Sequence, residues 1–184
     1  MIKIIFAKKK DIRGILSVQK SVLIKNLKTK DAKKEGFLVY PISAKQLKEV
    51  LDDTRNIVLC AKDNNKIVGY ILSYNLNNWM KYKPEWIEKI KVKNGVKAIL
   101  NEKKVIYLRH IARKKNYSGV GTRLLKYFIN LLRKKKVDYI ICEILEKYPK
   151  NKRSVQFFSK FGFKRVGSIT YDDGLIWGLY LLKL

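Results

Sequence analysis

Hydrophobic residues recur along this chain with two spacings, one typical of β-strands and one typical of helices. The strand-like runs are rich in β-branched and aromatic residues and are bounded by turn-forming segments. Lys62-Asp63-Asn64-Asn65-Lys66 separates two of them and predicts an antiparallel hairpin, and Asp172-Asp173-Gly174 predicts another. Strands are therefore expected at residues 2–6, 57–61, 67–74, 105–112, 139–144, 164–171 and 175–182.

Helical spacing begins after Asp11, which is expected to cap a helix whose apolar residues (Ile12, Ile15, Leu16, Val22 and Leu23) share one face. Ser43 and Gln46 have the spacing of a capping box, which predicts a second, short helix. Two further helices are expected at residues 122–132 and 154–161. Residues 77–104, where Pro84 could start a helix, are interpreted as an insertion.

The order of these elements indicates the fold class. One helix joins the strands at 105–112 and 139–144, so these two strands are expected to be parallel with a right-handed connection. The remaining order predicts an α+β fold with a mixed, mostly antiparallel central sheet flanked by helices. The length of 184 residues and 47% apolar content suit a single domain, residues 1–184, with the insertion at about 77–104.

Composition adds a strong positive charge. Lys and Arg number 42 against 15 Asp and Glu, a formal net charge of +27, which would attract polyanions or belong only to a solvated surface. Cys60 and Cys142 lie in apolar runs and are expected to be buried free thiols. With one histidine and no zinc spacing, no metal site is expected. Neither a signal peptide nor a membrane span is apparent, so the chain is expected in the cytoplasm.

The segment 105–132 reads as a strand, a basic loop and an amphipathic helix. Gly119 and Gly121 would let the backbone approach a ligand closely, and the free N–H groups of the helix start favour an anion. A dinucleotide fingerprint is disfavoured because Leu124 stands at its third glycine position, and a P-loop is excluded because Gly-Lys-Ser/Thr is absent. The ligand predicted here carries phosphate.

Two motifs in order resemble the GNAT superfamily of N-acetyltransferases. The first is Asn116-Tyr117-Ser118-Gly119-Val120-Gly121, which keeps the glycines of the family's cofactor loop but has Asn at its first position and lacks the usual upstream Pro. The second begins at Asn151 and ends at Gly162-Phe163. Apart from residues 77–104, the order of elements also resembles the family.

The resemblance implies an acetyl-CoA-dependent enzyme that acetylates a primary amine, on a small molecule or a protein, by direct attack in a ternary complex. No metal is implied, and the protein is expected as a monomer or homodimer that does not bind membranes. Coenzyme A would place its pyrophosphate on the loop and its pantetheine arm along the strand. The implied cofactor-binding residues are Ile111, Ala112, Arg113, Asn116, Tyr117, Ser118, Gly119, Val120, Gly121, Thr122, Asn151 and Phe158.

A general base must deprotonate the amine, because a protonated amine has no lone pair. Glu143 is the leading candidate and resembles the Glu of the ribosomal-protein-alanine acetyltransferases, although it could also form a salt bridge. His110 is a weaker candidate that alternation places on one face with Leu108 and Ala112. Phe158 stands where many relatives have a proton-donating Tyr, so Tyr148 or Tyr171 would have to replace it, or the thiolate leaves unaided.

A nucleic-acid or ribosome-binding protein on the same fold, with weak or no catalysis, is the alternative. Trp79, Tyr82 and Trp86 stand among lysines and could stack on bases, or they could anchor the insertion to the core. The net charge of +27 argues against a polyamine acceptor, because a positively charged protein would repel it.

Overall fold

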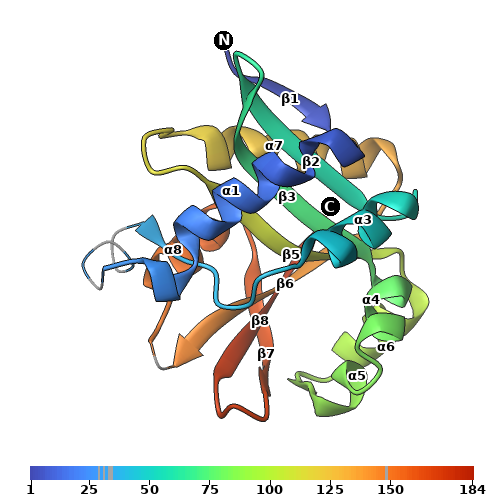
Figure 1. The fold of residues 1–184 in the computed structure, drawn as a ribbon. Helices are drawn as coiled ribbons and strands as arrows, with labels where there is room; N and C mark the ends of the chain where they lie inside the picture. The colour runs from blue at the N-terminus through green and yellow to red at the C-terminus, as the bar shows by residue number, and fades with distance from the viewer. Residues whose placement is uncertain (29, 31, 33–34, 148) are drawn as a thin grey trace.

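The computed structural model describes residues 1–28, 30, 32, 35–147 and 149–184 of the chain. Its centre is an eight-stranded sheet with the order β1-β2-β3-β5-β6-β8-β7-β4 (Figure 1). The strands are β1 (Lys3–Phe6), β2 (Ile57–Asp63), β3 (Lys66–Asn75), β4 (Lys91–Val92), β5 (Val105–Arg113), β6 (Tyr139–Lys147), β7 (Lys164–Thr170) and β8 (Ile176–Lys183). The expected mixed, mostly antiparallel sheet is confirmed.

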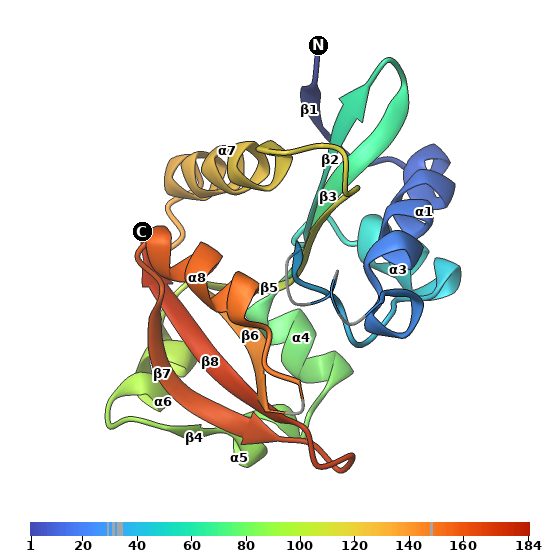
Figure 2. The same cartoon turned by 90° about the vertical axis from the view of Figure 1, so that its left-hand side faces the viewer.

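The strands β5 and β6 are parallel and pair only over part of their length. Their register runs from Val105 opposite Tyr139 to Leu108 opposite Cys142 and then stops. Beyond this point β5 stays paired with β3 as far as Arg113, while β6 stays paired with β8 as far as Lys147. The sheet therefore opens between its two central strands, and its halves diverge as seen in Figure 2.

Helices cover both faces of the sheet (Figures 1 and 2). α1 (Ile12–Val22) and α3 (Ala44–Asp52) pack on one face, and α7 (Val120–Lys134) and α8 (Lys152–Lys160) on the other. The face of α7 is set by apolar residues at helical spacing, Leu124, Leu125, Phe128 and Leu132, all of them buried. Short 3-10 turns at Lys9–Asp11 and Ile24–Asn26 flank α1.

Local sequence signals explain where several elements begin and end. The predicted hairpin is confirmed, with Asn64 and Asn65 at φ values of 44° and 67° in the turn between β2 and β3. The capping box of Ser43 and Gln46 is present at the start of α3. The expected side-chain cap by Asp11 is wrong, because its carboxylate accepts from the Lys8 N–H (2.9 Å) and pairs with Lys62 (2.8 Å) instead.

The segment interpreted as an insertion forms α4 (Leu76–Tyr82), α5 (Trp86–Lys89), the strand β4 and α6 (Val96–Glu102). β4 pairs with β7 and extends the sheet at its edge. Trp79 and Trp86 are only 4% and 1% exposed, so they anchor these elements to the core. Buried in this way, neither indole can stack on a nucleic-acid base.

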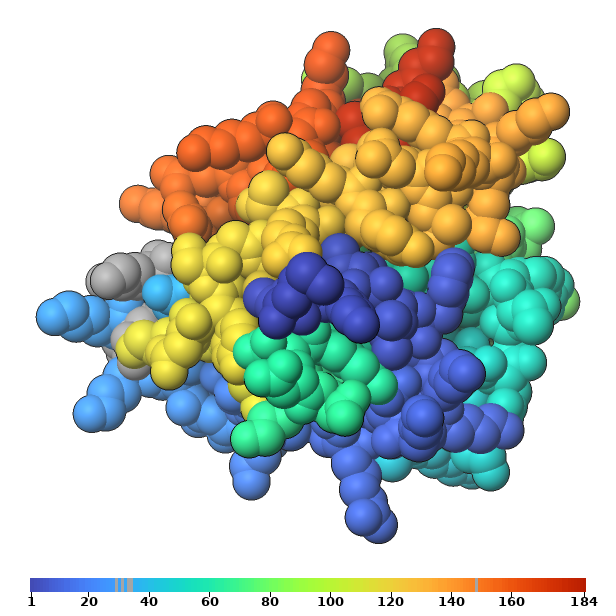
Figure 3. Space-filling model, turned by 90° about the horizontal axis from the view of Figure 1, so that it is seen from above, coloured from blue at the N-terminus to red at the C-terminus, as the bar shows by residue number. Residues whose placement is uncertain are grey.

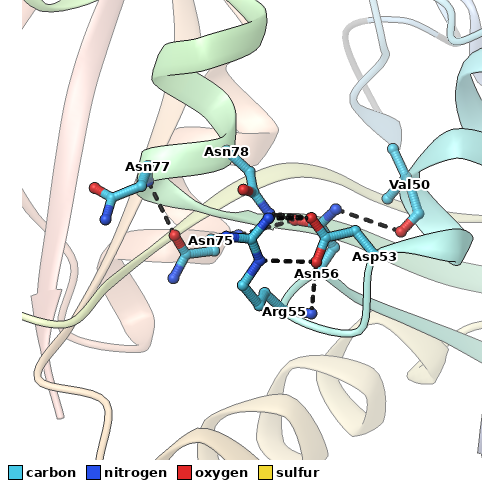
Figure 4. A network of polar contacts seen from close by, with 7 residues as sticks. All are labelled: Val50, Asp53, Arg55, Asn56, Asn75, Asn77 and Asn78. Atoms are coloured by element: carbon cyan, nitrogen blue, oxygen red, sulfur yellow. Dashed lines mark hydrogen bonds and ion pairs between the residues drawn. The ribbon is translucent and has the colours of Figure 1, made fainter.

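A polar network connects α3, β2 and α4 (Figure 4). Asp53 accepts hydrogen bonds from Arg55 and from the Asn78 side chain. Asn56 donates to the Val50 carbonyl and accepts from Asn78 and from the Asn75 N–H. The network fixes the start of α4 on the side of the sheet where β2 begins, and so positions the helix that carries Trp79.

Both cysteines are buried and unpaired, as expected, and burial raises the pKa of the Cys60 thiol to about 12. None of the helices in the described part of the chain is long and apolar enough to cross a membrane.

Candidate active site

A cavity of about 610 Å³ follows the opening between β5 and β6. Its walls come from both diverging strands, from the start of α7, from α8, and from the loops that carry Tyr40 and Tyr171. The segment that contains Gly119 and Gly121, residues 116–121, is called the glycine loop below. The cavity connects this loop with the side chains that surround Glu143. A large concave site at a break in a sheet is the expected location of a ligand.

The glycine loop leads into α7 beside this cavity. Gly119 is the N-cap residue with a φ of 77°, a left-handed conformation that favours glycine. Among the described residues, no backbone carbonyl accepts from the N–H groups of Ser118, Gly119, Gly121 or Thr122, and all of these residues line the cavity. Free donors at the start of a helix are suited to a phosphate anion.

Side chains around the loop hold its shape. Arg113 donates to the carbonyls of Lys114 (3.0 Å) and Lys115 (2.7 Å) and pairs with Glu35 at 2.6 Å. Tyr117 donates to Asp63 at 3.3 Å. Figure 3 shows the loop, in yellow, on the surface beside the N-terminal strand and the turn between β2 and β3. The Arg113 guanidinium is thus already engaged in bracing the loop.

The structure brings most of the expected cofactor-binding residues to the cavity and leaves others outside it. The residues that line it are Ile111, Ala112, Arg113, Ser118, Gly119, Gly121, Thr122, Asn151 and Phe158. Asn116 and Tyr117 lie elsewhere in the loop, and Val120, the first residue of α7, is buried and donates its N–H to the Tyr117 carbonyl at 3.4 Å. Asn116, the position that departs from the family motif, therefore has no direct place in the cavity wall.

Asn151 has a structural role that is visible without a ligand. Its Oδ1 accepts from the Ser154 N–H (3.2 Å) and so caps α8, and its Nδ2 donates to the Phe37 carbonyl (2.9 Å). The side chain is buried and joins α8 to the loop that precedes α3. It therefore positions two walls of the cavity.

We expect Asn151→Ala to lower the free energy of unfolding by about 2 to 4 kcal/mol, because it removes a cap and leaves a buried carbonyl without its donor. Ser43→Ala is the matched control, since Ser43 caps α3 at an exposed site and its loss should cost only about 1 kcal/mol. Urea denaturation measures both. Equal losses would contradict the role assigned to the contact with Phe37.

Glu143 follows Cys142, the last residue of β6 that pairs with β5, and so lies where these two strands diverge. One carboxylate oxygen accepts from the Trp86 indole N–H at 2.5 Å, and the other accepts from the Tyr171 hydroxyl at 2.9 Å. The side chain is half-buried and lines the cavity. It forms no ion pair among the described residues, so the salt-bridge interpretation of this carboxylate finds no partner.

Burial raises the pKa of Glu143 above its usual 4.5, while hydrogen bonds from Trp86, Tyr171 and Tyr107 and the positive charge of Arg109 oppose the rise. A carboxylate with a raised pKa is a stronger base than an exposed one. The position and the proton affinity of Glu143 both suit a general base.

His110 occupies a different environment because β5 contains a bulge. His110 lies opposite Leu72 and Leu108 lies opposite Ser73, so Arg109 is the extra residue. The bulge reverses the alternation: Leu108 packs on the α7 side, while Ala112 packs on the other side and His110 contacts Tyr70 there at 3.1 Å. The expectation that His110 shares a face with Leu108 is therefore wrong. Burial lowers the pKa of His110 to about 3, so the imidazole stays neutral.

The candidates for a proton donor differ in their surroundings. Phe158 is buried against Phe157 and Phe163 and lines the cavity without a polar group. Tyr171 donates to Glu143, which was not apparent from its place at the end of an expected strand. Burial and the neighbouring Glu143 raise the pKa of Tyr171, so its hydroxyl is protonated at neutral pH. Tyr148 lies outside the described residues.

Sequence patterns did not reveal two residues of the site. Trp86 is distant from Glu143 in sequence, and only the folded insertion brings its N–H to the carboxylate. Arg109 stands beside His110 in a run that reads as regular strand, and a bulge leaves no mark on such a run. The one signal in the sequence that could have identified Arg109 was a basic residue inside an otherwise apolar strand.

Comparisons with known proteins give the class of this protein. The model of the Acetyltransferase (GNAT) family matches residues 26–163, most of the chain. The chain belongs to this family and is an acetyltransferase. The family uses acetyl-CoA. A search of curated proteins found no match.

Solved structures of acetyltransferases share the fold. The chain is similar to the ribosomal-protein-S18-alanine N-acetyltransferase from Escherichia coli, with a TM-score of 0.64, 15% identity, and coverage of 100% of this chain and 94% of that one. Ard1 from Thermoplasma volcanium gives a TM-score of 0.68 and 13% identity, with coverage of 100% of this chain and 97% of that one. A NatC complex bound to Gag peptide and CoA gives a TM-score of 0.65 and 16% identity, with coverage of 100% of this chain and 98% of that one. At this identity, the similarity establishes the fold.

Proposed function

We propose that this acetyltransferase transfers an acetyl group from acetyl-CoA to a primary amine, by direct attack in a ternary complex. Glu143 is the general base and the glycine loop with the start of α7 binds the pyrophosphate of the cosubstrate. The observation that carries this proposal is one continuous cavity with free helix N–H groups at one end and Glu143 at the other. The acceptor is a protein N-terminus or a lysine, and the protein alanine named for structural neighbours supports the first of these.

The residues present fit acetyl-CoA. Gly119 and Gly121 leave the backbone N–H groups of the loop accessible, and β5 beyond Leu108 has an edge that β6 does not cover. The N-terminus of α7 adds a favourable dipole for an anion. Acetyl-CoA supplies the acetyl group as a thioester, which an amine can attack once it is neutral.

Glu143 takes the proton that the amine must lose. The amine nitrogen forms a bond with the thioester carbonyl carbon, the bond between that carbon and sulfur breaks, and the sulfur leaves with the electron pair. Trp86 and Tyr171 hold the carboxylate by their hydrogen bonds. A proton for the sulfur can come from water or from Tyr171, whose hydroxyl is protonated.

Trp86→Phe is expected to shift the acidic limb of the pH dependence of kcat/KM upward by about one unit, because Glu143 loses a hydrogen bond that favours its charged form. Tyr171→Phe should give a similar shift. If Tyr171 only orients Glu143, the rate above the limb stays near that of the wild type, whereas a proton donor would be revealed by a fall in that rate. Initial rates measured across a pH series distinguish these results, and an unshifted limb in Trp86→Phe would contradict the role of the indole.

A further inference from the structure

Arg109 is a half-buried cation in the wall of the catalytic cavity. The bulge in β5 directs its side chain to the group of aromatic residues on α4 and β3. Its Nη1 donates to the Tyr74 hydroxyl at 3.1 Å. The guanidinium carbon lies 5.7 Å from the centre of the Trp79 ring and 5.8 Å from that of the Tyr82 ring. These contacts fix the plane of the guanidinium.

No carboxylate of the described residues forms an ion pair with this cation. Within the described part of the chain, no Asp or Glu oxygen lies within the 4.0 Å of an ion pair with Arg109. Glu143 is near enough for an electrostatic effect, but its two oxygens accept from Trp86 and Tyr171. A cation that is removed from water without a counterion is costly, and most of the five N–H donors of Arg109 have no acceptor among the residues that the structure describes.

We infer that Arg109 determines acceptor specificity by binding a carboxylate of the acceptor, so that the substrates are primary amines that also carry a carboxylate. This inference rests on the function proposed above. The amine would lie at Glu143 and the carboxylate at Arg109, so the two charges of the cavity match opposite charges on one acceptor. A free amino acid, or an acidic residue close to the N-terminus of a polypeptide, has this chemistry.

The geometry favours a carboxylate over a neutral partner. A guanidinium donates two parallel hydrogen bonds to a planar anion, and the aromatic rings hold that fork in one orientation. The net charge of +27 also draws anionic acceptors toward the protein. A cationic acceptor would meet an uncompensated positive charge beside its own.

The test uses matched acceptors with the full-length protein. One set compares alanine with alaninamide, and the other compares the peptide amides Ser-Asp-Ala and Ser-Asn-Ala. The wild type should acetylate the acidic member of at least one set with a kcat/KM roughly tenfold higher or more. Arg109→Gln should abolish that preference through KM, and Arg109→Lys should retain only part of it, because Lys keeps the charge without the fork. The set that shows the preference identifies the source of the carboxylate.

Two controls separate the possible failures. Arg133→Gln removes the same charge at an exposed position of α7 and should leave the preference unchanged. Calorimetry with acetyl-CoA alone should give the same Kd for the wild type and for Arg109→Gln, which also shows that the variant is folded. A wild type that binds acetyl-CoA but shows no preference, or acetylates no member of either set, overturns the inference, as does a preference that Arg109→Gln retains. A wild type that does not bind acetyl-CoA overturns the proposed function itself.

Discussion

Replacing Glu143 by Gln is expected to lower kcat by about 100-fold to 10,000-fold, with the Kd for acetyl-CoA unchanged. Gln keeps the shape of the side chain but cannot accept the proton of the amine. In the wild type, kcat/KM should fall as the pH decreases through a pKa above 4.5, because burial raises the pKa of this carboxyl. The variant should lack that fall. Steady-state rates across a pH series and calorimetry with acetyl-CoA measure the two effects.

Glu146→Gln is the matched control on the same strand. Glu146 accepts hydrogen bonds from Arg165 and Tyr180 and does not line the cavity, so its replacement should leave kcat near the wild-type value.

The two variants should also differ in stability. A raised pKa means that Glu143 stabilises the fold below about pH 4.5 and that this contribution is lost as the pH rises through the folded pKa.

The contribution of Glu146 to stability has the opposite pH dependence, because Arg165 lowers the pKa of this carboxyl. The contribution is present above about pH 4.5 and is lost in acid. Thermal unfolding at several pH values measures both contributions without any assay of activity. Equal loss of activity in the two variants would show that the proposed base is misassigned.

Gly121→Glu is expected to weaken acetyl-CoA binding by about 100-fold or more, because it places a carboxylate where the loop would hold a pyrophosphate. The helix itself should tolerate the change, since Glu is a better helix former than Gly and an acidic side chain is favourable in the first turn. Calorimetry should therefore report lost binding while circular dichroism and the Tm stay close to those of the wild type.

Gly121→Ala is the control at the same position. A Cβ there would lie 3.8 Å from the Phe157 ring, an ordinary contact, so the Kd should change by no more than about threefold. Wild-type affinity in Gly121→Glu would rule out this loop as the pyrophosphate site.

The sequence was sufficient to predict most of the fold because each signal was local. The Asn64-Asn65 turn, the capping box at Ser43 and the apolar stripe of α7 all depend on residues close to one another in the chain. The parallel pairing of β5 and β6 followed from the single helix that joins them. The small strand β4 was missed because two residues paired at a sheet edge have no periodicity to detect.

The site was predictable where it depends on the backbone and less so where it depends on side chains. Gly119 and Gly121 directly mark the loop that we propose to bind the pyrophosphate, whereas the surroundings of Glu143 come from Trp86 and Tyr171, which are remote in sequence. The interpretation of Asp11 as a cap failed because Lys62, on the strand β2, pairs with its carboxylate. The face of His110 was assigned incorrectly because one bulged residue reverses the alternation of a strand.

The opening of the sheet also bears on how far sequences with this fold can diverge. Beyond Leu108 and Cys142 the facing edges of β5 and β6 are not paired with each other, and unpaired edges in most sheets invite unwanted association between chains. Here the edges face each other across the cavity and are shielded by the two halves of the sheet. A ligand held by main-chain groups at such an edge places few demands on side-chain identity. Neighbours at 13% to 16% identity therefore keep one architecture with few shared side chains.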